Sequence, residues 1–196
     1  MRSNVCKIEK GTRDLDAILR ESERVAEYNG LNHKQTLQLR LLCEEIDGML
    51  PNIIDDFEGK LWIDFEDGVC KVNISIQIPE LNTDRKTELI GIAKNKKNAA
   101  AVGIVGKIRN AIENFFLDDM TAVAFSATFR PSIAFSEGVD YSYLWSLQQY
   151  KTTVKHEEQT AAWDELEKSV IASAADDVIV GVKGKCAQIV IIKKFS

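Results

Sequence analysis

The stretch KLWIDFEDGVCKVNISIQI, residues 60–78, constrains the fold of this chain more than any other stretch. Apolar and polar residues alternate on both sides of the pair Asp67-Gly68. Alternation with a period of two is typical of a half-buried β-strand, and Asp-Gly is a favoured two-residue turn between antiparallel strands. The stretch therefore predicts a β-hairpin that has one face against the core and the other face in water.

Two helices are predicted before this hairpin. Apolar residues at helical spacing indicate a first helix over residues 12–29. Asn32, with Gln35 three residues later, forms a capping-box pattern at the start of a second helix. This helix should run to about Leu50, because the proline at position 51 predicts a break there.

The rest of the chain predicts further helices and then a second pair of strands. Residues 120–140 fit a strand or a loop equally well. The order of helices, hairpin, helices and hairpin predicts an α+β two-layer sandwich, with helices on one face of a mostly antiparallel mixed sheet. The expected helices cover residues 83–93, 98–116, 141–155 and 160–174, and the two last strands join at 183–185.

Composition narrows the classes of function. The chain has 196 residues, which suits a single domain over 1–196, and its net charge is −5. One short basic cluster, KNKK, gives no reason to expect nucleic-acid binding. No apolar run reaches the roughly 18 residues that span a membrane, and the first ten residues lack the apolar centre of a signal peptide. We therefore expect a soluble cytoplasmic protein that binds neither nucleic acid nor membrane.

The sequence gives no sign of a metal site. The four cysteines form no C-x-x-C pair, so we interpret them as buried thiols in a reducing compartment. The two histidines, His33 and His156, lie far apart in sequence with no second ligand nearby.

Two adjacent acids interrupt an apolar helical run in LRLLCEEIDGML, residues 39–50. Together with the strand pair, a later glycine-bearing helix and a final strand pair, this segment resembles the histidine-kinase-type ATPase (GHKL or Bergerat) fold. The likeness is greatest to the anti-sigma-factor serine kinases, in which the helix reads roughly L-x-L-x-x-E-E-x-x-x-N. The resemblance implies ATP and Mg²⁺ as cofactors, with Glu45 as general base beside Glu44. It covers most of residues 12–117 and about the last twenty, and leaves about 120–175 as an insertion.

The sequence departs from that family at the positions that hold the nucleotide and the metal. Met49 stands where the family has its magnesium-binding asparagine, and a thioether is a poor ligand for a hard cation. Asn52 comes about one turn too late. The family's Asp-x-Gly-x-Gly box after the hairpin is missing, and Asp84 is only an isolated acid nearby. Glu45 is therefore a candidate remnant of a catalytic site; the alternative is that Glu44 and Glu45 are helix-surface acids with a structural or partner-facing role. We expect that no cofactor is used.

A lysine-rich stretch before a glycine-bearing helix is the best candidate for a ligand site. The G-x-x-G spacing partly matches the family's glycine box, and a helix N-terminus attracts anions. The stretch is not a Walker A loop, because Ala101 replaces its first glycine and Ile108 replaces its Ser or Thr. The alternative is a solvated loop before a tightly packed helix. The candidate anion or nucleotide ligands are Lys94, Lys96, Lys97, Asn98, Gly103, Gly106 and Lys107.

A cluster of aromatic residues between positions 138 and 150 offers a second candidate site. Tyr and Trp are frequent at protein interfaces because they bury a large area at low entropic cost. The cluster therefore predicts either packing of an inserted helix on the domain or a surface for a partner, including a second copy in a homodimer. Its members are Tyr141, Tyr143, Trp145 and Tyr150.

These patterns favour a catalytically degenerate histidine-kinase-like ATPase domain that acts as a regulatory binding module, through contacts with a partner protein. One alternative is an active ATP-binding serine kinase of the anti-sigma type. A second alternative, based on the lysine-rich stretch, is a sensor of a phosphorylated small molecule.

Overall fold

The computed structural model covers residues 1–196 and describes residues 1–10, 14–54, 57–77, 103–117, 142–155 and 169–195. Its centre is a six-stranded sheet in the order β1-β2-β3-β6-β5-β4. All neighbouring strands in this sheet are antiparallel, so the predicted α+β class is confirmed, whereas the described strands contain no parallel pair. The strands are β1 Cys6–Glu9, β2 Glu58–Glu66, β3 Val69–Gln77, β4 Ser142–Ser146, β5 Asp177–Lys183 and β6 Cys186–Lys194.

The predicted hairpin is confirmed as β2 and β3. Their register pairs Leu61 with Ile74 and Glu66 with Val69. Asp67 and Gly68 both have positive φ, 50° and 76°, as a tight turn between twisted strands requires. The C-terminal hairpin of β5 and β6 is confirmed as well, and it places β6 between β3 and β5.

The two predicted N-terminal helices are present as α1, Leu15–Tyr28, and α2, His33–Ile53. The capping box is formed as expected: the Asn32 side chain accepts the Gln35 N–H at 3.0 Å, and the Gln35 side chain accepts the Asn32 N–H at 2.9 Å. The predicted break at Pro51 is wrong, because α2 continues to Ile53. Proline removes only one hydrogen bond near a helix end. Burial of Ile53 in the core favours the extra turn.

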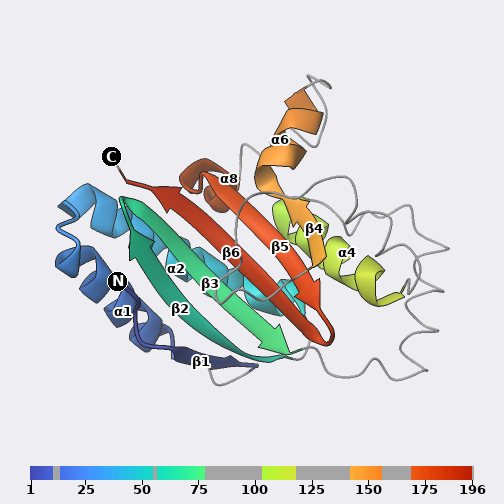
Figure 1. Ribbon diagram of the computed structural model, residues 1–196, viewed down its shortest axis with the longest axis horizontal. Helices are drawn as coiled ribbons and strands as arrows, with labels where there is room; N and C mark the ends of the chain where they lie inside the picture. The colour runs from blue at the N-terminus through green and yellow to red at the C-terminus, as the bar shows by residue number, and fades with distance from the viewer. Residues whose placement is uncertain (11–13, 55–56, 78–102, 118–141, 156–168, 196) are drawn as a thin grey trace.

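The hydrophobic core lies between the helices and one face of the sheet, and α1 and α2 lie behind the sheet in Figure 1. Apolar side chains of α1 and α2 contribute to it, together with alternate residues of the strands. Two further helices, α4 Gly103–Leu117 and α8 Val170–Ala174, add Ile104, Ile108, Ile112 and Ile171 to the same core. The helix expected over 98–116 is therefore described from residue 103 onward.

The opposite face of the sheet differs from the prediction of a face in water. At its centre Asn73, Val190 and Ile179 lie side by side on β3, β6 and β5, and each is at most 2% exposed. Ile192 and Val69 extend this second apolar cluster. The sequence alternation identified the two faces correctly. Of the alternating polar residues of β3 on this face, Asn73 is nevertheless buried, whereas Lys71 and Ser75 are half-buried and Gln77 is exposed.

Two strands were missed in the sequence. The helix predicted over 141–155 is wrong in its first part, where β4 pairs with β5, and α6 begins only at Leu147 and runs to Lys155. The aromatic residues there favour a strand once β5 offers an edge to pair with. Strand β1 is four residues long and pairs with β2.

Some sequence predictions fall outside the described residues. These are the helix at 83–93, the lysines at 94–97, the ambiguous stretch at 120–140 and most of the helix at 160–174. Within the described ranges, no helix is both long enough and apolar enough to cross a lipid bilayer.

Candidate functional site

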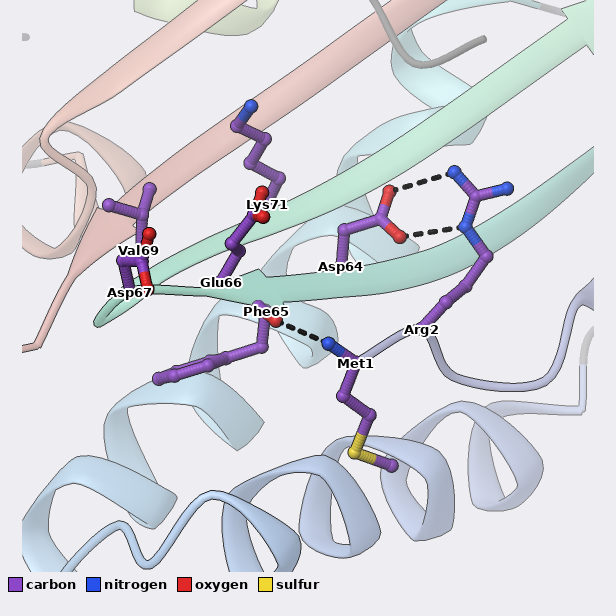
Figure 2. A pocket seen from close by; sticks show the side chains of 8 residues that line it. All are labelled: Met1, Arg2, Asp64, Phe65, Glu66, Asp67, Val69 and Lys71. Carbon is purple, nitrogen blue, oxygen red and sulfur yellow. Dashed lines mark hydrogen bonds and ion pairs between the residues drawn. The ribbon is translucent and has the colours of Figure 1, made fainter.

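A groove of about 630 Å³ lies where the first residues of the chain meet the turn of the β2–β3 hairpin, as Figure 2 shows. Val69 adds an apolar side chain on the face of the sheet that carries Asp64 and Lys71, whereas the side chains of Met1 and Phe65 point to the other side of β2. Arg2, Asp64 and Lys71 supply charged groups within it, and two more acids stand at the turn. The groove is therefore a candidate binding site in the described part of the chain.

The N-terminal segment forms one wall of the groove by pairing with the outer edge of β2. The Met1 amino group donates to the Phe65 carbonyl at 2.6 Å, and the Phe65 N–H donates back to the Met1 carbonyl at 2.8 Å. The Ser3 N–H donates to the Ile63 carbonyl at 2.8 Å, and the Ile63 N–H donates to the Ser3 hydroxyl at 2.8 Å. This pairing continues the edge that β1 covers further along β2.

Asp64 is the electrostatic centre of the site. Its carboxylate accepts the Nε–H of Arg2 at 2.7 Å and an Nη2–H of the same guanidinium at 3.4 Å (Figure 2). It also accepts the indole N–H of Trp62 at 3.1 Å and an amide N–H of Asn73 at 3.0 Å. The Arg2 guanidinium lies 5.7 Å from the centre of the Trp62 ring. Asp64 therefore joins Arg2 of the N-terminal segment to the buried side chains of Trp62 and Asn73.

Lys71 stands directly opposite Asp64 in the register of β2 and β3. A cross-strand pair of opposite charges in this position normally forms an ion pair. Here the Asp64 oxygens are already bound by Arg2, Trp62 and Asn73, and the described structure gives the Lys71 ammonium no ion pair. Lys71 is half-buried on the wall of the groove, and Figure 2 shows its ammonium directed away from Asp64.

Glu44 and Glu45, the two adjacent acids of α2, lie elsewhere, on the helix that faces the core. Glu44 accepts a hydrogen bond from Arg40 Nε at 3.2 Å, and Arg40 also donates to Glu23 on α1 at 2.6 Å. Glu44 therefore helps to join two helices. Glu45 is half-buried, and within the described residues it forms no hydrogen bond or ion pair.

Met49 lies in the hydrophobic core and is 5% exposed. Asn52, the late substitute for a metal ligand, is an exposed residue of α2, and its side-chain amide donates to the Gly48 carbonyl at 3.4 Å. In the described residues no group of three His, Cys, Asp or Glu side chains could hold a metal ion.

The structure brings together residues from the two other candidate sites. Lys107 on α4, from the anion candidates, has its ammonium 5.5 Å from the centre of the Tyr150 ring on α6. Tyr150 in turn packs against Trp145 of β4, with ring centres 5.9 Å apart, and both rings pack on the core. This arrangement is a cation–π contact within the domain.

The remaining candidates are only partly placed. Gly103 begins α4 with a φ of 77°, a left-handed conformation that favours glycine, and Gly106 is buried. Lys94, Lys96, Lys97, Asn98 and Tyr141 lie outside the described residues, and Tyr143 is placed on β4.

A second electrostatic cluster, around Asp177 at the start of β5, has a structural role. One Asp177 oxygen accepts the Gln148 N–H at 3.0 Å and the Val178 N–H at 2.8 Å, so it caps the start of α6. Burial raises the pKa of the Asp177 carboxyl above its ordinary value, against these hydrogen bonds and the attraction of Lys151. Burial lowers the pKa of Lys151, whose ammonium donates to the Ala172 carbonyl at 2.7 Å. Asp177 and Lys151 therefore both make hydrogen bonds that stabilise the fold.

The groove was missed in the sequence, because its parts come from positions that share no motif. Arg2 and Asp64 are 62 positions apart, and neither residue type marks a site by itself. The alternation of residues 60–78 placed Asp64 and Lys71 on the same face of the hairpin, which was the only available signal.

Comparison of the chain with models of known protein families, with curated proteins and with solved structures gives no match. The assignment of function therefore depends on the geometry of the chain itself.

Proposed function

We propose that this protein is a regulatory binding module, built on a catalytically degenerate histidine-kinase-like ATPase fold, that acts in the cytoplasm through contacts with a partner protein. The observation that carries this proposal is the burial of Met49 in the core at the position where an active relative would hold Mg²⁺. A buried thioether supplies no oxygen to a hard cation.

The order of elements supports the fold part of the proposal. The acid-bearing helix α2, the hairpin of β2 and β3, the glycine-bearing helix α4 and the final hairpin of β5 and β6 follow one another along the chain. The resemblance in sequence rests on this same order. The sheet and its covering helices are compatible with it.

The packing of α2 against α4 supports the absence of catalysis. Ile46, Met49 and Ile53 of α2 belong to the same buried cluster as Ile104 and Ile108 of α4. Apolar side chains thus fill the contact between the two helices that, by the resemblance, would bound a nucleotide site. Placing a charged triphosphate among them would leave its oxygens without donors, which is strongly unfavourable.

Thermal unfolding of the protein with ATP and Mg²⁺, with ADP and in buffer alone tests the proposal, together with an assay of phosphate release. We expect no shift of the midpoint and no turnover. Magnesium-dependent stabilisation with turnover would establish the active kinase instead. Stabilisation by ADP or phosphate without magnesium would favour the sensor of a phosphorylated molecule.

The variant Met49→Asn separates a single lost ligand from a wider loss of the site. We expect no turnover in this variant, because the aspartate box that would bind adenine is missing as well and the new amide would lie in an apolar core. ATP hydrolysis by Met49→Asn would contradict the proposal.

A further inference from the structure

We propose that the groove beside the N-terminal segment docks an acidic side chain of the partner protein, and that Lys71 is the residue that recognises it. This inference rests on the proposed binding function and names the surface and the chemistry of the partner. Lys71 lies on the opposite face of the sheet from the core side chains of α2, so the inference does not depend on whether a nucleotide binds there.

No acid among the described residues neutralises the positive charge of Lys71. Asp64, its register partner, receives four hydrogen bonds from three other side chains. Two of those side chains, Trp62 and Asn73, are buried, so Asp64 cannot turn to Lys71 without leaving buried donors unpaired. The Lys71 ammonium, which points away from Asp64, is therefore left without a carboxylate partner among the described residues.

The surroundings of Lys71 strengthen its attraction for a carboxylate. Lys71 is half-buried on the face of the sheet that carries the second apolar cluster, with Val69 two residues away on β3 and Ile192 opposite it on β6. A cation beside an apolar surface binds a carboxylate more strongly than a solvated lysine does, because part of the water is displaced.

The charges around the groove favour a protein segment over a small anion as its ligand. Arg2 and Asp64 neutralise each other at 2.7 Å, so Lys71 is the cation that remains to attract a ligand. Glu66 and Asp67 stand at the turn, and the described structure gives neither an ion pair. An isolated small anion would be repelled by these two acids. A protein segment that carries an acidic side chain for Lys71 and a basic side chain for the turn is complementary to the whole groove.

The test is a titration of isotope-labelled full-length protein with two blocked peptides, followed by the amide chemical shifts of Phe65, Val69 and Lys71. The peptides are acetyl-Lys-Leu-Asp-Leu-amide and its twin with asparagine in place of aspartate, which differ only in the charge that Lys71 would read. We expect saturable shifts with the aspartate peptide and about tenfold weaker binding of the asparagine peptide, because the asparagine offers Lys71 no negative charge.

Three variants identify the lysine. Lys71→Met removes the ammonium but keeps an unbranched apolar side chain, and it should weaken binding of the aspartate peptide about tenfold. Lys71→Arg keeps the charge and should retain binding. Lys60→Met is the matched control and should leave binding unchanged. Lys60 lies on β2, on the same face of the sheet as Lys71, at an exposed position outside the groove.

The proposal is overturned by the absence of saturable shifts in the groove, by equal affinity for the two peptides, or by unchanged binding to Lys71→Met. Unaltered amide shifts elsewhere in the sheet show that each variant is folded. ATP turnover by the wild-type protein would refute the proposed function without affecting this titration, so the two failures are distinguishable.

Discussion

Removing the carboxylate of Asp64 should destabilise this protein far more than the exposure of the residue suggests. Its side chain is 24% exposed and lies at the edge of a groove, where a substitution to alanine is usually nearly neutral. In this protein, however, Asp64→Ala leaves the Trp62 indole N–H and one amide N–H of Asn73 without their acceptor. Trp62 is 8% exposed and Asn73 is fully buried, so water cannot easily replace the lost partner.

The size of the effect follows from these contacts. Each buried donor that loses its acceptor costs about 1–3 kcal/mol, and the half-exposed ion pair with Arg2 adds about 0–1 kcal/mol. We therefore expect Asp64→Ala to lower the free energy of unfolding by about 2–7 kcal/mol. Asp64→Asn keeps one acceptor oxygen and should lose about half as much. Arg2→Ala removes only the exposed partner and should lose about 1 kcal/mol.

Urea unfolding of the three variants, followed by tryptophan fluorescence and circular dichroism, measures these differences. The reasoning is refuted if Asp64→Ala lies within about 1 kcal/mol of the wild type, or if Arg2→Ala is as destabilising as Asp64→Ala. Either result would mean that the buried donors find other acceptors or that the ion pair dominates.

Further outcomes follow from the packing and from the pKa values. Gly59→Ala should destabilise the protein by about 2–3 kcal/mol in urea unfolding, because its new Cβ would overlap the Ser75 carbonyl of the neighbouring strand. Gly48→Ala is its matched opposite and should stabilise α2 by about 0.5–1 kcal/mol, since nothing lies within 4 Å of its new Cβ. Burial raises the pKa of Cys70 to about 12, so iodoacetamide at pH 8 should label this thiol only after urea unfolds the chain, and fast labelling of the folded protein would disprove its burial. Burial raises the pKa of Asp177 above its ordinary value of 3.8, so the folded state holds this proton more tightly than the unfolded state does. The protonated carboxyl therefore contributes to stability at low pH, and this contribution is lost as the pH rises from 3.8 through the raised pKa. The stability of Asp177→Asn relative to the wild type should therefore increase between pH 4 and pH 7, and a decrease would contradict the assigned cause.

The elements predicted correctly are those whose signals are local. The Asp67-Gly68 turn, the alternation on either side of it and the capping box at Asn32 each lie within a few residues of the structure that they specify. Strand β1 and the strand at 142–146 gave no such signal. Four or five residues are too few to establish a period, and their conformation is decided by the edges of β2 and β5 with which they pair.

The candidate site was harder to predict than the fold because it depends on contacts between distant residues. Nothing near Arg2 in the sequence indicates that it reaches Asp64, and nothing near Lys71 shows that its cross-strand acid is already bound. Glu44 and Glu45 on α2 were predicted as a candidate site only because their segment resembles the acid-bearing helix of the histidine-kinase-type ATPases. Their neighbour Met49 proved to be an ordinary part of the core, as apolar spacing at a helix face predicts.

The central position of β6 has a consequence for the order of events during synthesis. β3 leaves the ribosome early, yet the strand that pairs with its inner edge begins only at Cys186, after the whole of residues 78–185 has been made. Until then the nascent hairpin presents an unpaired backbone edge flanked by isoleucine and valine side chains, a surface prone to intermolecular association. Productive folding of this chain on the ribosome therefore requires that the early hairpin be shielded, by its own helices or by a chaperone, until the last hairpin emerges to complete the sheet.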